Sequence, residues 1–351
     1  MTVTLAKHLG AAVLAAIVLV TLSDTLGQFR QYQMAEVAAW VIAVAGLSIL
    51  VGLSGQLSVG NGAFMAVGAY SSALLLMHLH WAIELIFVAS VVIAAAAGAV
   101  FGVAAARLRG PYLAGATLML AVAVPFVAVA WPGVFGGDQG LDVLVTVPGF
   151  LGASFPFTRW LAWLTCAFAL VGLVLLANLA HSRVGRSWRA LRDDEVAASL
   201  AGLNVARLQV LAFVVSAACA GLGGALLATW AASANPGEFS LTLSIGLLTA
   251  VVLGGLGSLA GAVWGSLVLV LVPSYLTNLG ASHGLSSGAS ASVPIAIYGV
   301  VLIVVMLLFP AGIQGGIRRF LGLAAPTTAG PLSTWRRHRP ASKQQPEEGT
   351  S

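Results

Sequence analysis

The charged residues whose spacing could support a function gather in one stretch, residues 178–207. Apolar runs of membrane-spanning length flank this stretch on both sides. Arginines recur at every third position and lead directly into an acidic triplet; these residues are Arg183, Arg186, Arg189 and Arg192, then Asp193, Asp194 and Glu195. The chemistry that this pattern offers is recognition of another protein rather than bond breaking.

A short helix explains the second half of this stretch. The acidic triplet would occupy its first turn, where the helix dipole favours negative charge, and Gly202 would follow its end. Helical spacing places four small or acidic residues on one face, namely Asp194, Ala197, Ala198 and Ala201. A face this flat lets another protein approach closely, although a solvated loop with an ordinary cap would have the same pattern.

A second polar stretch runs from Val51 to Tyr70 and begins with glycines and uncharged hydrogen-bonding side chains. Small residues then recur every four positions, which lets membrane helices approach closely. Irregular backbone at membrane depth is tolerated where it is buried in protein or lines a cavity. We therefore expect either a tight helix crossing or part of a path, with Gln56, Ser58 and Asn61 as its polar residues.

A third stretch, from Ala250 to Gly265, is rich in glycine. The pair Gly254 and Gly255 could break a helix between two spans, and small residues continue at intervals of four at Gly257, Gly261 and Gly265.

Several kinds of chemistry have no residues to support them. The ATP-binding motif needs Gly-Lys-Ser/Thr, but Lys7 precedes His8 and Lys343 precedes Gln344. The six histidines are scattered, so we expect no metal site and no cofactor. The centres of the apolar runs lack the acids that ion-coupled carriers use, so energy should enter from outside the chain.

Composition indicates a membrane protein. The 351 residues are 59% hydrophobic and 8% charged, against about 25% charged in soluble domains. Apolar runs of about 20 residues recur along the chain, which predicts an all-α, polytopic transmembrane helix bundle. The net charge of +5 does not indicate nucleic-acid binding, because the basic residues lie in short loops between the runs. Cys166 and Cys219 lie inside apolar runs and are expected to be unpaired core residues.

We predict about ten spans, at residues 9–23, 34–52, 62–79, 84–105, 111–131, 159–179, 208–230, 241–257, 259–278 and 293–310. Of the 16 lysines and arginines, all but Arg30 and Arg159 then fall on one side. The positive-inside rule makes that side cytoplasmic, together with the N- and C-termini and the stretch 178–207. Residues 1–325 would form the transmembrane domain, and the polar residues 326–351 a disordered cytoplasmic tail.

Three of these motifs, in order, resemble the permease subunits of ATP-binding cassette (ABC) importers, in particular the branched-chain amino-acid family. The segment Gly52 to Phe64 resembles the family's G-L-S-G-Q-x-S-x-G-x-G-A-F, with Asn61 where many relatives have His. The segment Glu195 to Gly202 resembles the Glu-Ala-Ala loop, with Val196 in place of the Glu. Gly254 to Ser258 resembles the G-G-x-G-[ST] segment.

The resemblance implies a multi-pass protein of the bacterial inner membrane. It implies two cytoplasmic ABC ATPase subunits, a second homologous permease subunit, a periplasmic substrate-binding protein and surrounding lipid as partners. The loop at about 180–207 would couple to the ATPases through Arg192, Asp193, Asp194, Glu195, Ala197, Ala198, Ala201 and Gly202. The translocation path would involve Gln56, Ser58, Asn61, Gly254, Gly255 and Gly257.

Other functions remain open at this point. Relatives in the same family carry urea or short amides, so the substrate could be one of these instead of branched-chain amino acids. A channel or secondary carrier that acts alone is a different class, and uptake without ATPases would favour it. A membrane-embedded enzyme is disfavoured by the missing catalytic groups.

Overall fold

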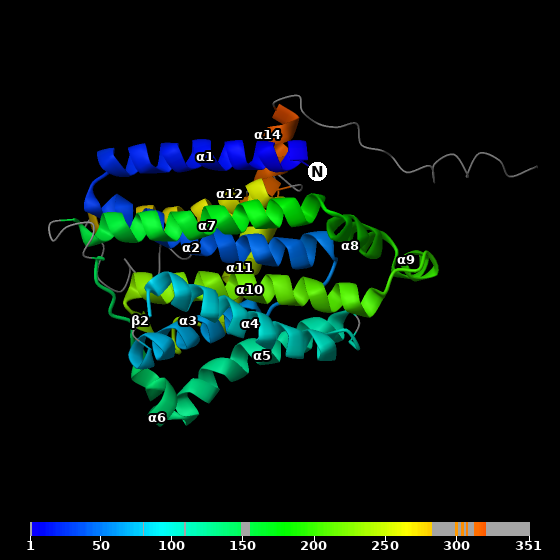
Figure 1. Cartoon of the computed structure of the whole chain (residues 1–351), viewed down its shortest axis with the longest axis horizontal. Helices are drawn as coiled ribbons and strands as arrows, with labels where there is room; N and C mark the ends of the chain where they lie inside the picture. Colours follow the sequence, from blue (N-terminus) through cyan, green and yellow to red (C-terminus); the bar gives the residue numbers. More distant parts are fainter. Residues whose placement is uncertain are drawn as a thin grey trace, which may run out of the picture.

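The computed structural model describes residues 2–79, 81–108, 110–148, 155–282, 299–300, 303–304, 307 and 312–320. Long helices run side by side through the molecule (Figure 1). They are α1 (Thr2–Thr25), α2 (Gln28–Ser48), α3 (Asn61–His78), α4 (Ile83–Ala105), α5 (Pro111–Ala130), α7 (Phe157–His181), α10 (Val205–Ala231), α11 (Leu241–Gly254) and α12 (Leu259–Ser282). A π-helical turn, η1 (Ile49–Leu53), extends α2.

Shorter elements lie at the two ends of the bundle. At one end, α8 (Arg183–Asp193) and α9 (Glu195–Leu200) project beyond the long helices, and we call these two helices the elbow (Figure 1). At the other end, the sheet end, α6 (Pro132–Phe135) and η2 (Gly137–Gln139) lead into β1 (Leu141–Asp142). Strand β1 pairs antiparallel with β2 (Ser233–Ala234). The last described helix is α14 (Gly312–Phe320).

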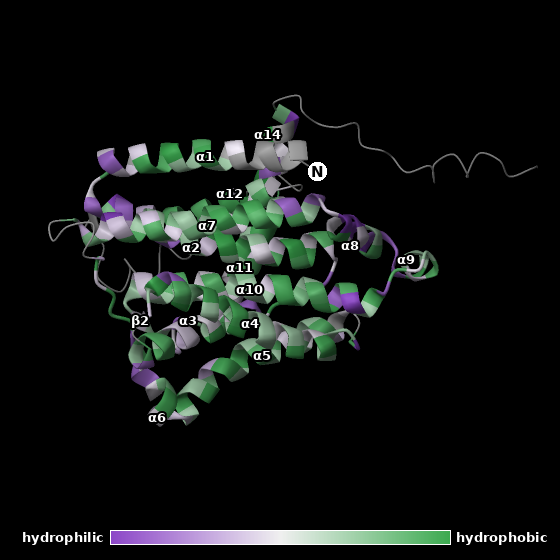
Figure 2. Ribbon diagram, in the orientation of Figure 1, coloured by the Kyte–Doolittle hydropathy of each residue, from purple (hydrophilic) through white to green (hydrophobic). Residues whose placement is uncertain are grey.

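Within the described residues, six helical segments are long and apolar enough to cross a membrane. Figure 2 shows hydrophobic residues along the middles of the helices and hydrophilic residues gathered on α8. The fold is therefore the polytopic helical bundle that the composition predicts. Helices occupy nine of the ten predicted segments, and most of the tenth, 293–310, lies outside the described residues, as does the predicted tail 326–351. The count of ten spans stays a prediction.

Helix α10 packs against α2, α3 and α4 at the centre of the bundle. Its glycines allow this, because each meets a neighbouring helix where a side chain would not fit. A Cβ at Gly224 would lie 1.9 Å from the carbonyl oxygen of Met65, and one at Gly68 would lie 2.0 Å from that of Gly221. Close approach through small residues is how membrane helices gain packing energy.

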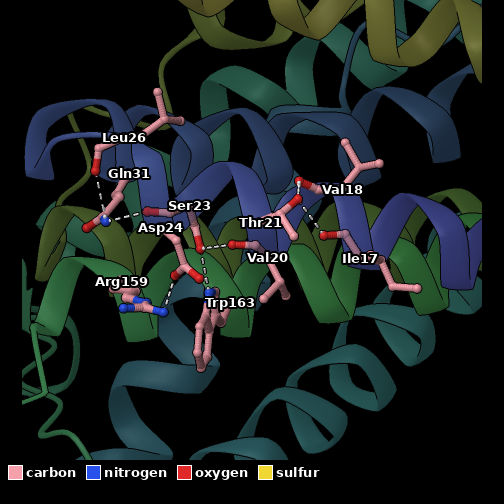
Figure 3. A network of polar contacts seen from close by, with 10 residues as sticks. All are labelled: Ile17, Val18, Val20, Thr21, Ser23, Asp24, Leu26, Gln31, Arg159 and Trp163. Atoms are coloured by element: carbon pink, nitrogen blue, oxygen red, sulfur yellow. Dashed lines mark hydrogen bonds and ion pairs between the residues drawn. The ribbon is translucent and has the colours of Figure 1, made fainter.

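A polar network holds α1 to the rest of the bundle at the sheet end (Figure 3). Asp24 forms an ion pair with Arg159 of α7. The indole of Trp163 donates to the Ser23 hydroxyl at 2.8 Å, and the Gln31 amide donates to the Ser23 carbonyl at 2.8 Å. Arg159, one of the two basic residues predicted to lie on the outer side, is thus paired with an acidic residue.

The packing of α10 gives a test of the fold. Gly224→Ala forces a methyl group into the Met65 backbone, and we expect it to lower the free energy of unfolding by roughly 1–3 kcal/mol. Gly115→Ala is the matched control, since no heavy atom lies within 4 Å of the added Cβ. The unfolding midpoint of the purified protein in detergent measures both. Equal shifts in the two variants would contradict the close packing of α10.

Candidate coupling elbow and broken-helix site

Helix α8 lies against the bundle through one apolar face. It begins after Ser182, whose hydroxyl accepts hydrogen bonds from the backbone N–H groups of Val184 and Gly185. Trp188 is fully buried, and its indole donates to the Leu208 carbonyl of α10 at 2.9 Å. Neither the role of Trp188 nor α8 as a separate helix is among the predictions from the sequence. The spacing of Gly185, Trp188 and Leu191, three residues apart, was the available signal.

Two of the four arginines bind the end of α7. Arg189 donates to the Ala180 carbonyl at 2.5 Å, and Arg186 donates to the His181 carbonyl at 3.3 Å. The last carbonyls of a helix lack partners within the helix, and basic side chains satisfy them favourably. These two arginines therefore fix the turn from α7 into the elbow.

Helix α9 has a well-defined cap at each end. The Asp194 carboxylate accepts from the N–H groups of Val196 and Ala197 at 2.8 and 3.0 Å, which is the N-cap arrangement. At the other end Gly202 has φ +84°, and the Leu203 N–H donates to the Ala198 carbonyl, as in a Schellman motif. The predicted helix and its terminal glycine are confirmed.

The acidic triplet divides between two helices, contrary to the expectation that it would fill one first turn. Asp193 is the last residue of α8, Asp194 is the N-cap of α9, and Glu195 is the first residue of α9. The chain must leave helical geometry at the cap, where Asp194 has φ −158° and ψ 110°. One aspartate therefore ends a helix and the next begins one.

The predicted flat face of α9 is also divided. Asp194, Ala197 and Ala201 are exposed, but Ala198 is 4% exposed and points into the protein. The most exposed apolar side chains of the helix are instead Val196 and Leu200, at 67% and 84%. Helical spacing could not show how α9 is rotated against α10, and this rotation buries Ala198 and exposes Val196 and Leu200.

Arg192 connects the elbow to the break in α2. Its guanidinium donates to the Gly52 carbonyl within η1 at 2.7 Å and to the Asp193 carboxylate at 3.2 Å. Its side chain lies over Gly55, where a Cβ would come within 2.8 Å of the Arg192 Cγ. Gly55 also has φ +74°, so a residue with a side chain is disfavoured there for two reasons.

Residues 54–60 form the non-helical segment between η1 and α3. The Ser54 hydroxyl donates to the Leu50 carbonyl at 2.7 Å, and the Gln56 N–H donates to the same carbonyl at 3.2 Å. The Gln56 amide donates to the Ser54 hydroxyl and to the Gln209 carbonyl of α10. Backbone and side chains thus satisfy one another where the helix is interrupted, as membrane-depth backbone requires.

The predicted polar residues of this segment are buried. Gln56, Ser58 and Asn61 have almost no exposed surface. Asn61, the first residue of α3, accepts a hydrogen bond from the Ser216 hydroxyl of α10 at 3.2 Å. Its Nδ2 and the Oε1 of Gln56 have no hydrogen-bond partner within the described residues. A buried amide group without a partner costs free energy, so these two atoms are the least satisfied part of the segment.

The second break, between α11 and α12, meets the first. Gly255 and Gly257 have φ +113° and +75°, and the Gly257 N–H donates to the Ser48 hydroxyl of α2 at 3.2 Å. A Cβ at Gly52 would lie 2.0 Å from the Gly257 nitrogen, so the two backbones are in direct contact. The structure therefore joins Gly52 with Gly257 beside the polar segment, while Gly254 packs against Gly261 and Gly255 against Gly312.

A polytopic helical bundle with broken helices in its interior is an architecture of membrane transport proteins. Residues 29–310 match the family described as the branched-chain amino acid transport system permease component, and the chain belongs to this family.

Its relatives include the high-affinity branched-chain amino acid transport system permease protein LivM of Escherichia coli K12. LivM is 33% identical over 254 residues, which are 66% of this chain and 60% of LivM. The permease protein LivH of Salmonella typhimurium is 28% identical over 299 residues, which are 79% of this chain and 92% of LivH. The aligned part is thus about 60% of the length of LivM but nearly all of LivH. No solved structure matches the chain.

The cap of α9 can be tested by hydrogen exchange. Asp194→Ala removes the acceptor of two backbone N–H groups and should destabilise the first turn of α9 by about 1 kcal/mol. The amide hydrogens of Val196 and Ala197 should then exchange about fivefold faster. Asp193→Ala is the control, because it removes the same charge but no backbone acceptor. Unchanged exchange in Asp194→Ala would contradict the capping role.

Proposed function

We propose that this chain is the permease subunit of an ABC importer that moves branched-chain amino acids across the bacterial inner membrane. The family and the names of LivM and LivH support this assignment. The observation that carries the mechanism is the contact of Arg192 with Gly52, because it ties the elbow to the broken-helix site. ATP would be hydrolysed by separate subunits.

The proposal places the elbow and both chain termini in the cytoplasm, with about ten spans. The distribution of lysines and arginines supports this orientation. The start of α1 lies at the elbow end of the bundle in Figure 1, in agreement with it. Residues 1–325 would be the transmembrane domain and 326–351 a cytoplasmic tail.

The elbow would dock on an ATPase subunit. Val196 and Leu200 are exposed and one helical turn apart, so they would contact the partner together with Ala197 and Ala201. The buried Ala198, with the caps at Asp194 and Gly202, would hold α9 in place. Asp193 and Glu195 would lie beside the contact.

ATP-driven movement of the elbow would then alter the broken-helix site through Arg192. Two states are required, one closed and one open. Burial of Gln56, Ser58 and Asn61 fits the closed state. Opening would part the backbones at Gly52 and Gly257, and the unpartnered amide atoms would hydrogen-bond to the solute.

The complete importer would contain two cytoplasmic ABC ATPases, a second homologous permease subunit and a periplasmic substrate-binding protein, surrounded by lipid. LivM and LivH are both named as permeases of one kind of transport system, which supports a pair of related subunits. Urea or a short amide is a second candidate substrate, favoured by the uncharged amides of Gln56 and Asn61 at the site.

Arg192→Gln tests the coupling. The variant loses one charge-assisted hydrogen bond, so we expect solute transported per ATP hydrolysed to fall about tenfold in the reconstituted importer. Arg183→Gln is the control, because Arg183 is an exposed arginine of the same helix. A wild-type ratio in Arg192→Gln would refute the transmission through Gly52. Uptake by the chain without ATPases would instead favour a channel or secondary carrier.

Leu200→Glu and Ala198→Glu test the docking surface. Leu200→Glu places charge on the exposed face, so the ATPases should no longer copurify while the unfolding midpoint stays unchanged. Ala198→Glu buries a charge, which costs several kcal/mol, so the midpoint should fall. Retained ATPases in Leu200→Glu would rule out this docking surface.

A further inference from the structure

An acidic residue at the sheet end has no role in the mechanism above. Glu238 lies in the turn between β2 and α11, where the Asn235 side chain accepts from the Gly237 N–H at 2.8 Å. The Glu238 N–H donates to the Asn235 carbonyl at 3.2 Å, and the next residue, Phe239, is fully buried. The turn is therefore fixed by its own hydrogen bonds, and Glu238 within it is partly buried.

Tyr70 of α3 lies beside this turn. Its side chain is 4% exposed, and its ring packs against Phe135 at 5.3 Å and Phe239 at 6.4 Å between centroids. The Tyr70 hydroxyl and the Oε2 atom of Glu238 are both buried, and neither has a hydrogen-bond partner in the described part of the chain. Because Tyr70 contacts Phe239, the residue that follows Glu238, these two unpartnered groups lie in the same part of the sheet end.

Further aromatic rings complete the surroundings. The ring of Tyr32 in α2 stacks on the ring of Trp230 at 4.7 Å between centroids. Together with the contact of Tyr70 and Phe239, this stacking makes the surroundings of the turn aromatic. Burial raises the pKa of Glu238, which means that the surroundings do not compensate its charge.

No cation in the described residues forms a salt bridge with Glu238. Arg159, on the same end of the bundle, pairs with Asp24, and Arg30 is exposed. A partly buried carboxylate without a cationic partner has an unfavourable free energy of burial. A ligand with a positive charge would offset this free energy and would therefore be bound favourably. Aromatic faces add to the attraction for an ammonium group.

We infer that Glu238 and the Tyr70 hydroxyl form a binding point for the ammonium group of the solute at the sheet end of the bundle. An ammonium group has three donors, and the carboxylate and the hydroxyl oxygen are acceptors. Asn61 and Tyr70 belong to the same helix, nine positions apart, or about 13.5 Å along α3 at 1.5 Å per residue. The solute would meet Glu238 before it reaches the broken-helix site, and this step rests on the proposed transport function.

Carbodiimide labelling of the purified full-length chain in lipid nanodiscs tests the binding point without any partner. Carbodiimides modify protonated carboxyl groups in apolar surroundings, and mass spectrometry measures the modified fraction of Glu238. Three probes are compared. Leucine carries both an ammonium and a carboxylate group, 3-methylbutylammonium carries the ammonium group alone, and 4-methylpentanoate carries the carboxylate group alone.

Leucine and 3-methylbutylammonium should slow modification of Glu238, and 4-methylpentanoate should not. Tyr70→Phe should weaken this protection about tenfold, the effect of one hydrogen bond to a charged group. Modification of the exposed Glu84 is the internal control. Equal rates with all three probes would overturn the inference.

Uptake by the assembled importer separates this inference from the proposed function. Glu238→Gln should raise the KM for leucine about tenfold, while Glu84→Gln should leave it unchanged. If the wild-type importer moves no leucine but 3-methylbutylammonium still protects Glu238, the proposed function fails and the binding point stands. If Glu238→Gln only weakens binding of the substrate-binding protein, Glu238 pairs with a basic residue of that protein and the inference is wrong.

Discussion

The contact between Gly52 and Gly257 is the constraint on which the rest of the structure depends. Two helices are interrupted inside an apolar bundle, and their free backbone groups need partners there. Ser48 accepts from the Gly257 N–H, and Arg192 donates to the Gly52 carbonyl. Because neither glycine has a side chain, the two interruptions meet directly. One residue of the elbow is thereby bonded to the point where both breaks cross.

The bundle around this contact separates a rigid part from a part that can change. The glycines of α10 bring its backbone against α3 and α4, and such packing leaves little room for rearrangement. The segment 54–60 is not helical and is held by side-chain bonds of Ser54 and Gln56 and by the bond from the Val59 N–H to the Thr117 hydroxyl. Movement transmitted through Arg192 would therefore act on the weaker part while α10 stays in place.

The sequence predicts the helices, the small helix α9 and the glycines at its end and at the breaks, because hydrophobic periodicity and backbone chemistry are local properties. It could not predict that Ala198 faces inward or that Arg192 binds Gly52, because both depend on how separate helices dock. The contact between Gly52 and Gly257 could not be predicted either, since the two residues are distant in sequence. The burial of Glu238 could not be predicted either, because it arises from the turn around that residue.

The most direct test of this account is the labelling rate of a cysteine at Ser58, a buried residue of the interrupted segment. Ser58→Cys would be made with Cys166 and Cys219 replaced by serine, in the importer assembled with its ATPases. Binding of a non-hydrolysable ATP analogue should change the rate at which a thiol reagent labels the cysteine at position 58. The additional substitution Arg192→Gln should abolish this change. A rate that is the same with and without the nucleotide would contradict it.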